Sequence, residues 1–284
     1  SGVSQGSLVA PSALREPPSW PRSASVRLTA AQTSVLTRAA SRCGVTMNTV
    51  VQGAWGLLLA RRLGQRDVVF GSVVSGRSPE VPGIERMLGF FLNTVPVRVR
   101  PEPGESLADL VRRVQEQQAA LTPHHHLGLA GIQRSLGVDV LFDTLTVFEN
   151  YPVDAAAVAA AGDVEIHHAL HYPLALFTHP GEAIRLELRY QPAVFTAEDA
   201  TGVLHELAEV LAAVAEDPGR PVEPLITGPV PTPQAQPSGA GSRPEVTTVV
   251  QLFQEQVART PDAVALLCDG VATTYADLDA RANR

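Results

Sequence analysis

The chain has 284 residues, a net charge of -7 at pH 7 and 22 basic side chains, all of them arginine. The negative charge and the lack of any basic run argue against a nucleic acid or an anionic membrane as partner. The absence of lysine excludes Schiff-base chemistry and any lysine-dependent phosphate site. A hydrophobic content of 45% with 18% charged residues is typical of a globular protein with a sizeable core.

The two cysteines, Cys43 and Cys268, lie in a helical pattern and in a strand-like run. Their separation suggests neither a metal site nor a disulfide framework, which is typical of a reducing compartment. No segment is as long as a membrane helix and no signal peptide opens the chain, so we expect a cytoplasmic protein. Because the chain begins at Ser1 and stops inside a helical pattern at Arg284, we expect an excised piece of a longer protein.

The first third of the chain predicts an arm followed by two helices. Residues 1–25 are rich in proline, serine and glycine and are expected to form a linker or extended arm. Helices are predicted over 28–42 and, capped by Thr46, up to Leu63. The second helix is apolar on nearly every side, as in a buried element, and Trp55 is expected in the core.

The stretch from Asp67 to Arg100 says more about the fold and function of the chain than any other segment. Its pattern predicts a buried strand over 68–74, a shaped loop over 75–83, a short turn over 84–87 and a half-exposed strand to residue 100. In the last strand, valines alternate with polar and charged residues. A loop of this length between two strands is a candidate for a functional role.

The following segments predict two helices, then three strands and then a last long helix. A helix begins after Ser106, which has Asp109 three residues on as in a capping box, and a similar start with Thr196 precedes the last long helix. The predicted helices cover 107–121, 129–136 and 197–216, and the predicted strands cover 144–150, 174–178 and 184–190. The final two strands are joined by a Pro180-Gly181 turn.

The composition shifts to proline, glycine, serine and threonine over 221–245, which predicts an interdomain linker. Beyond it, 246–260 is predicted helical and 263–268 a strand. Residues 246–284 therefore begin a second folding unit.

Two of these segments have sequences that resemble motifs of known protein families. The sequence LGFFLNTVPVR over 88–98, preceded by Ser75-Gly76-Arg77 and Pro82-Gly83, closely resembles a core motif of the condensation domains of nonribosomal peptide synthetases. The resemblance implies an α/β fold, a chloramphenicol-acetyltransferase-like two-layer sandwich with a mixed sheet packed against helices. It places 26–220 in the C-terminal lobe of such a domain, with an arm over 1–25.

A second resemblance lies near the C-terminus. Thr274-Tyr275-Ala276-Asp277-Leu278, with Phe253 and the run 259–263 before it, resembles the first core motif of adenylation domains. The resemblance implies that 246–284 is the truncated start of an adenylation domain, joined through the linker 221–245. Such a piece is too short to bind ATP.

The histidines of the family signature are absent from the part of the sequence in which the resemblance implies them. The family signature, His-His-x-x-x-Asp-Gly, belongs to the first lobe, yet no histidine precedes Asp67. His125-His126 followed by Ala130-Gly131 matches the signature except that alanine replaces aspartate, and it falls after the core motif. We expect His124, His125 and His126 to be structural or solvent-facing, which makes His126 a decoy.

Metal binding by histidines is not expected. Three consecutive side chains diverge in a helix or a strand, so His124 to His126 do not readily face one ion. His167, His168 and His171 have helical spacing but lie in a strand-like context. No cofactor is therefore expected on this chain itself.

By resemblance, the loop after Ser75 forms the floor of a substrate tunnel. The candidate floor residues are Ser75, Gly76, Arg77, Gly89, Phe91 and Asn93. Asn93 is expected to tie the loop to neighbouring backbone rather than to contact substrate. Arg77 meets a phosphopantetheine phosphate or forms a loop salt bridge, and these two roles remain open. Residues 172–180 are expected to cross toward the missing lobe, leaving apolar surface uncovered and favouring self-association.

Three functions follow from these features. In the leading one, the chain is a fragment of a peptide-bond-forming domain and is inactive alone. Its partners are the missing N-terminal lobe, donor and acceptor carrier proteins with phosphopantetheine arms, and an adenylation domain. The alternatives are a free-standing acyltransferase using His126 as base and a docking platform for the adenylation domain. An epimerisation domain is disfavoured by the FLNT wording at 91–94, and the resemblance is to members that join an L-configured donor.

Overall fold

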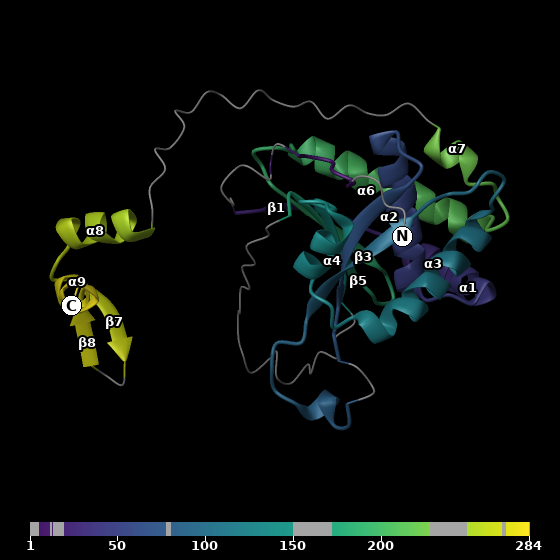
Figure 1. The fold of residues 1–284 in the computed structure, drawn as a ribbon. Coiled ribbons are helices and arrows are strands. Elements are labelled where there is room, and N and C mark those ends of the chain that lie inside the picture. The colour runs from purple at the N-terminus through teal and green to yellow at the C-terminus, as the bar shows by residue number, and fades with distance from the viewer. Residues whose placement is uncertain are drawn as a thin grey trace. The chain divides into compact units, whose positions relative to one another are not determined.

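The computed structural model describes residues 6–11, 13, 20–77, 81–149, 172–227, 249–268 and 271–283. The chain divides into two compact units, Ser1–Ala235 and Gln236–Arg284. Most of the predicted helices and strands are present within one or two residues of their expected ends. Figure 1 shows their arrangement. His167, His168 and His171, and most of the expected linker, lie outside the described residues.

A six-stranded mixed sheet forms the centre of the first unit, with the strand order β1-β6-β5-β4-β2-β3. The pairs β2/β4 and β4/β5 are parallel, and the other neighbouring pairs are antiparallel. Parallel neighbours need crossover connections, and the one between β2 and β4 contains the helices Leu107–Leu121 and Leu129–Leu136, which produces an α/β architecture. The strands are β1 (Arg22–Arg27), β2 (Val68–Val74), β3 (Asn93–Val99), β4 (Thr144–Phe148), β5 (Leu174–His179) and β6 (Arg185–Tyr190).

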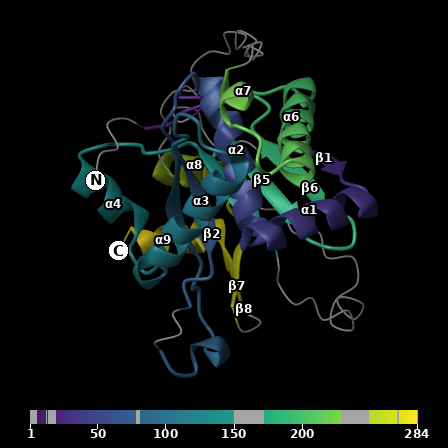
Figure 2. The ribbon, with the colours of Figure 1, turned by 90° about the vertical axis from the view of Figure 1, so that its right-hand side faces the viewer.

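Helices cover one face of this sheet and bury the main hydrophobic core (Figures 1 and 2). The core joins Leu36, Trp55 and Leu207 from three helices with Leu176 and Leu188 from the sheet. The helices of this unit are α1 (Ala30–Cys43), α2 (Met47–Leu63), α3 (Leu107–Leu121), α4 (Leu129–Leu136), α6 (Ala197–Glu216) and α7 (Glu223–Ile226), with short 3₁₀ turns η2 (Ile84–Arg86) and η3 (Thr122–His124). Among the described residues, no helix is both long and apolar enough to cross a bilayer.

The capping residues explain why the helices begin where the sequence predicts. Thr29, Thr46, Ser106 and Thr196 each accept a hydrogen bond from a backbone N–H in the first turn. Such a cap satisfies one of the donors left unpaired at a helix start. Gly56 lets α2 approach the sheet, because a Cβ there would lie 2.5 Å from the Val99 side chain.

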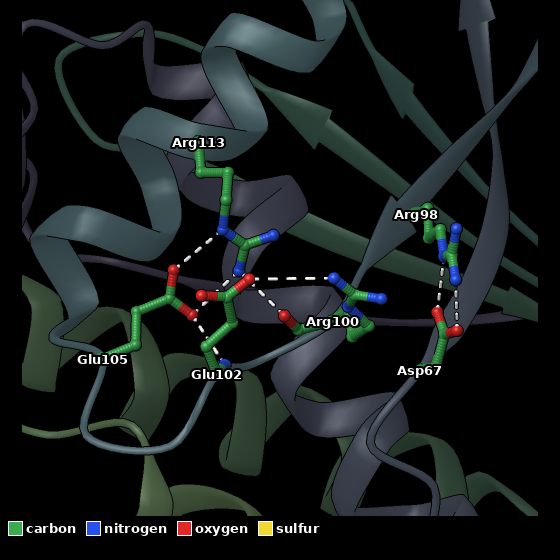
Figure 3. A network of polar contacts seen from close by, with 6 residues as sticks. All are labelled: Asp67, Arg98, Arg100, Glu102, Glu105 and Arg113. Carbon is green, nitrogen blue, oxygen red and sulfur yellow. Dashed lines mark hydrogen bonds and ion pairs between the residues drawn. The ribbon is translucent and has the colours of Figure 1, made fainter. Parts of the chain in front are cut away.

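A polar network anchors the far ends of β2 and β3, away from the loop that joins them (Figure 3). The guanidinium of Arg98 donates to both carboxylate oxygens of Asp67, at 2.7 and 2.6 Å. Arg113 of α3 pairs with Glu105 at 2.8 Å and donates to the carbonyl of Arg100 at 2.8 Å. The alternating polar residues of β3 thus fix the strand to its surroundings while its valines fill the core.

The N-terminal segment departs from the expectation of an arm over 1–25. Residues 22–25 belong to β1, the edge strand paired with β6. Further upstream, the buried carboxylate of Asp143 accepts hydrogen bonds from the backbone N–H groups of Val9 (2.9 Å) and Ala10 (2.6 Å). Burial raises the pKa of Asp143, while these hydrogen bonds favour its charged form. The described residues of this segment are therefore built into the fold.

Two further expectations differ from the structure. β5 is a central strand of the sheet and is buried over most of its length, so the expected exposed crossing over 172–180 is wrong. The expected linker begins too early, because Pro221 bridges to Ser106 and Val222 is fully buried before α7. Both errors arise because burial against distant segments is not encoded in local composition.

The second unit consists of α8 (Val249–Arg259), the antiparallel strands β7 (Val264–Cys268) and β8 (Val271–Thr274), and α9 (Tyr275–Ala282). Thr274 caps α9 by accepting from the backbone N–H of Asp277 at 3.2 Å. Phe253 packs on Tyr275 with ring centroids 6.0 Å apart. The residues that resemble an adenylation motif thus occupy a strand end and a helix start.

Candidate functional site

A pocket of about 520 Å³ lies at the carboxyl ends of β2 and β4. Ligands in open α/β sheets generally bind at the carboxyl ends of parallel strands, where loops gather and helices begin. We call this cavity the outer pocket. It is lined by Thr46, Met47, Asn48, Val73, Val74, Ser75, Gly76, Arg77, Thr122, Pro123, His125, His126, Val147 and Phe148.

The N-terminus of α2 forms one wall of the outer pocket. The Oγ1 of Thr46 accepts from the backbone N–H of Thr49 at 3.2 Å. From α3, the Oε1 of Gln115 accepts from the backbone N–H of Thr46 at 3.0 Å and from the hydroxyl of Thr49 at 2.7 Å. These bonds fix the start of α2 against α3 and leave little freedom in this wall.

The loop after β2 forms the opposite side. Gly76 has a φ of +59°, and a Cβ at this position would lie 2.1 Å from the carbonyl oxygen of Phe91, so only glycine fits. Arg77 donates to the carbonyls of Ile84 and Met87, and its guanidinium lies 4.4 Å from the centre of the Phe91 ring. Within the described part of the chain, Arg77 therefore holds the loop through backbone carbonyls rather than through a salt bridge.

Asn93 connects this loop region to the turn that carries the histidines. Its Nδ2 donates to the carbonyls of His125 at 2.7 Å and of Leu127 at 2.9 Å. Its Oδ1 accepts from the backbone N–H of Thr94 at 2.9 Å. All of these partners are backbone groups, which agrees with the expected tying role of Asn93.

The histidines of the turn differ in environment. His126 is exposed and its Nδ1 donates to the carbonyl of Pro123 at 3.0 Å, so its ring is engaged within its own turn. His125 is half-buried, and burial lowers its pKa below the ordinary value of 6.5, which makes the ring neutral at neutral pH. No group of three or more potential metal-ligating side chains occurs in the described part of the chain.

The structure separates the predicted floor residues into two groups. Ser75, Gly76 and Arg77 line the outer pocket. Gly89, Phe91 and Asn93 are not among its lining residues, and a Cβ on Gly89 would meet the Phe91 ring at 3.0 Å. Sequence reasoning missed the contributions of 46–48 and 147–148. The cap at Thr46 was a usable signal for the first, but the parallel pairing of β2 and β4 was not visible in the sequence.

An apolar surface lies on the loop that precedes β3. Leu88 is fully exposed and the side chain of Phe90 is 88% exposed, with Met87 and Leu92 partly exposed beside them. We call residues 87–92 the apolar loop. Large apolar side chains gathered in this way mark surfaces that contact another protein segment. These exposed side chains lie on the loop before β3 and not on 172–180, where the sequence predicted uncovered apolar surface.

The fold and the pocket define an α/β protein of the acyltransferase type, with helices on one face of a mixed sheet and a site at its strand ends. Residues 8–228 match the family model of the condensation domain. The chain therefore belongs to the condensation-domain family.

Curated relatives are parts of nonribosomal peptide synthetases. One of the linear gramicidin synthase proteins of Brevibacillus parabrevis is 34% identical over 254 residues, which cover 84% of this chain and 3% of that protein. Surfactin synthase subunit 3 of Bacillus subtilis is 32% identical over 275 residues, covering 90% of this chain and 21% of that protein. The chain thus spans a small part of the relatives it matches.

Solved structures of condensation domains share the fold. The first condensation domain of the CDA synthetase superimposes with a TM-score of 0.62 at 26% identity, covering 73% of this chain and 48% of that one. A four-domain nonribosomal peptide synthetase bound to AMP and glycine has the same fold over 91% of this chain and 22% of its own, with a TM-score of 0.62 at 16% identity. The chain spans about half of the solved condensation domain.

Proposed function

We propose that the chain up to residue 227, which includes β1 and α7, belongs to the C-terminal lobe of a condensation domain, that the residues after 227 link it to the next domain and that 246–284 begin an adenylation domain. The 48% coverage of the CDA condensation domain supports the single lobe. A match over 90% of this chain with surfactin synthase subunit 3 necessarily runs past residue 228, which supports a continuing synthetase.

The reaction of the parent protein is peptide-bond formation between two carrier-bound thioesters. The amine nitrogen of the acceptor attacks the thioester carbon of the donor, the carbon–sulfur bond breaks, and the carrier thiol leaves with a proton. A base or positioning group near the amine favours this attack. In this chain, the outer pocket supplies shape and polar contacts for the tunnel, and the phosphopantetheine arms of carrier proteins bring the substrates.

One observation carries the proposal that the chain is inactive alone. Of the two histidines at the outer pocket, His126 is exposed and bonded within its own turn, and His125 has lost water without gaining a carboxylate partner among the described residues. A catalytic base needs a held geometry and a partner that stabilises its charged form. The histidine of a separate N-terminal lobe, seated on the apolar loop, fulfils this need.

A second role is supported by the end of the first unit. Val222 is fully buried and its N–H donates to the carbonyl of Glu105 at 3.0 Å, so the segment entering the linker is fixed to the lobe. A fixed departure point makes the lobe a docking platform for the adenylation domain. The two roles are compatible, and both place the parent protein in the cytoplasm.

Peptide formation tests the proposal. The chain, and a longer chain extended upstream by the preceding codons of its gene, are each supplied with donor and acceptor carrier proteins loaded with aminoacyl thioesters. We expect dipeptidyl thioester by mass spectrometry only from the longer chain. Product from the shorter chain that disappears in His126→Ala would contradict the proposal and support a free-standing acyltransferase.

A further inference from the structure

A second cavity adjoins the outer pocket, on the helix side of β2. We call it the inner pocket; it has a volume of about 300 Å³ and lies between α2, α3 and β2. It shares Thr46, Asn48, Val74, Thr122 and His125 with the outer pocket. A group bound in the outer pocket can therefore reach the inner one.

The described walls of the inner pocket are polar but carry no fixed charge. None of the described lining residues is an aspartate, a glutamate or an arginine, and the imidazole of His125 is neutral because burial lowers its pKa. An ion entering such a site would lose water without gaining a counter-charge. The lining therefore suits an uncharged polar group. Its polar members are Thr46, Asn48, Thr49, Gln52, Ser72, Gln115, Gln118, Thr122 and His125.

Only the nitrogen of the Gln52 side-chain amide has a hydrogen-bond partner among the described residues. Gln52 is 2% exposed, and its Nε2 donates to the Oγ of Ser72 at 3.0 Å, but its Oε1 has no hydrogen-bond partner within the described part of the chain. Exchanging the two ends of the amide would leave the nitrogen unpaired instead. The amide of Gln115 is the contrast, because its Oε1 accepts two hydrogen bonds. Buried polar groups are nearly always paired, so the Oε1 of Gln52 is available to accept a hydrogen bond from a bound group.

His125 supplies a second unpaired atom on the same wall. Its Nε2 is buried and has no hydrogen-bond partner among the described residues, while its backbone is held by Asn93. A neutral imidazole nitrogen accepts or donates according to its tautomer. Gln52 and His125 together thus present one acceptor and one adaptable group, which is the complement of an amide or a hydroxyl.

We propose that the inner pocket is a subsite for an uncharged amide or hydroxyl group of the bound substrate, with Gln52 accepting its N–H or O–H and His125 completing the pair. This inference rests on the proposed function, because the substrates are those of peptide-bond formation. The group has two possible sources, an amide of the pantetheine arm or the side chain of the amino acid that the arm carries. Gln52 is thereby a substrate-binding residue, and it determines specificity where the bound group belongs to the amino acid.

The test compares the chain with its Gln52→Met variant, which keeps the length of the side chain and removes the amide. Gln117→Met is the matched control, since Gln117 lies on α3 outside the lining of the inner pocket. Pantetheine, seryl-pantetheine and leucyl-pantetheine are titrated while NMR follows the imidazole signals of His125 in every chain and the side-chain amide signal of Gln52 in the chains that keep it. Thermal unfolding shows whether the variants fold, and Gln52→Asn, which withdraws the amide by one methylene, replaces Gln52→Met if that variant does not.

We expect binding to weaken about tenfold in Gln52→Met and to stay unchanged in Gln117→Met. If the arm is the source, all three probes lose affinity alike; if the side chain is the source, seryl-pantetheine binds more tightly than leucyl-pantetheine and the variant removes the difference. Equal affinity in Gln52→Met and the unsubstituted chain, or no shift of the Gln52 signal with any probe, overturns the inference. Because binding is measured without catalysis, such a failure leaves the proposed lobe function to be judged by peptide formation.

Discussion

The side-chain amide of Asn93 donates to the backbone carbonyl of His125 at 2.7 Å, joining the start of β3 to a turn 32 residues further along the chain. A second bond to Leu127 makes this a two-point attachment. The wall of the outer pocket that contains His125 is therefore positioned by a residue that does not line the pocket itself. Loss of Asn93 is expected to disturb the pocket from behind.

We expect Asn93→Ala to lower the free energy of unfolding by about 1–3 kcal/mol, because two backbone carbonyls lose their donor. Urea denaturation measures the loss. Gln117→Ala on α3 is the control and is expected to change the stability by no more than about 0.5 kcal/mol. In addition, the imidazole signals of His125 should shift in NMR spectra of Asn93→Ala. Unchanged His125 signals and a stability equal to that of the control would contradict the positioning role.

Gly76→Ala tests the loop after β2. The positive φ and the approach of the Phe91 carbonyl oxygen to 2.1 Å from the added Cβ predict a destabilisation of about 1–3 kcal/mol. Gly202→Ala is the opposite case: Gly202 lies inside α6 with open space at its Cβ, so alanine should stabilise the helix by about 0.5–1 kcal/mol. Equal effects of the two substitutions in thermal unfolding would show that Gly76 is not conformationally required.

The pH dependence of stability should depend on Glu187. Burial acts to raise the pKa of Glu187, but hydrogen bonds and charges from Arg189, His179 and Arg185 outweigh it, so its pKa lies below the ordinary 4.5. A carboxylate with a depressed pKa stabilises the fold above its unfolded-state pKa, and this contribution is lost as the pH falls through the folded-state pKa. Acidification from neutral pH to below 4.5 should therefore cost the unsubstituted chain more stability than Glu187→Gln.

Urea midpoints at the two pH values measure this difference. The same substitution at the exposed Glu182 serves as control and should keep the full acid sensitivity of the unsubstituted chain. Identical losses for Glu187→Gln and Glu182→Gln would show that the cluster around Glu187 does not govern acid stability.

The apolar loop is expected to mediate self-association of the isolated chain. Changing both Leu88 and Phe90 to serine should weaken association about tenfold or more, since two strongly exposed apolar side chains are removed. Because neither side chain contributes to the core, the unfolding free energy should change by no more than about 0.5 kcal/mol. Sedimentation equilibrium decides the question, and a chain that is monomeric without any substitution would contradict this expectation.

The end of the first unit gives a prediction about its boundary. Val222→Ala should destabilise the unit by about 1–3 kcal/mol, because Val222 is fully buried in the main core. A chain ending after residue 227 should melt like the first unit of the whole chain, whereas a chain ending after residue 219 should melt at a lower temperature. Equal melting temperatures of the two shortened chains, followed by circular dichroism, would place the boundary earlier.

The sequence predicts local features of this fold well and distant ones poorly. The helices beginning after Thr46, Ser106 and Thr196 are predictable because the cap and the apolar periodicity lie within a few residues of each other. β1 escapes prediction because only two small apolar residues, Ala24 and Val26, alternate with its serines and arginines, and pairing with β6 makes the segment a strand. The central position of β5 and the burial of Val222 likewise depend on contacts with segments far away in the chain.

The candidate site shows the same division. The motif resemblance points to Ser75, Gly76 and Arg77, which do line the outer pocket. It does not reveal the inner pocket, because Gln52 and His125 are 73 positions apart and neither belongs to a motif with an expected functional role. Only the packing of α2 against α3 and the turn that follows it brings the two side chains to one cavity.

Peptide formation by the chain alone tests the central proposal most directly. The chain is incubated with loaded donor and acceptor carrier proteins beside the same chain extended upstream through its own gene. The proposal predicts no dipeptidyl thioester from the chain alone and product from an extension that carries His-His-x-x-x-Asp-Gly. Product from the chain alone, or an upstream extension without that signature, would contradict it.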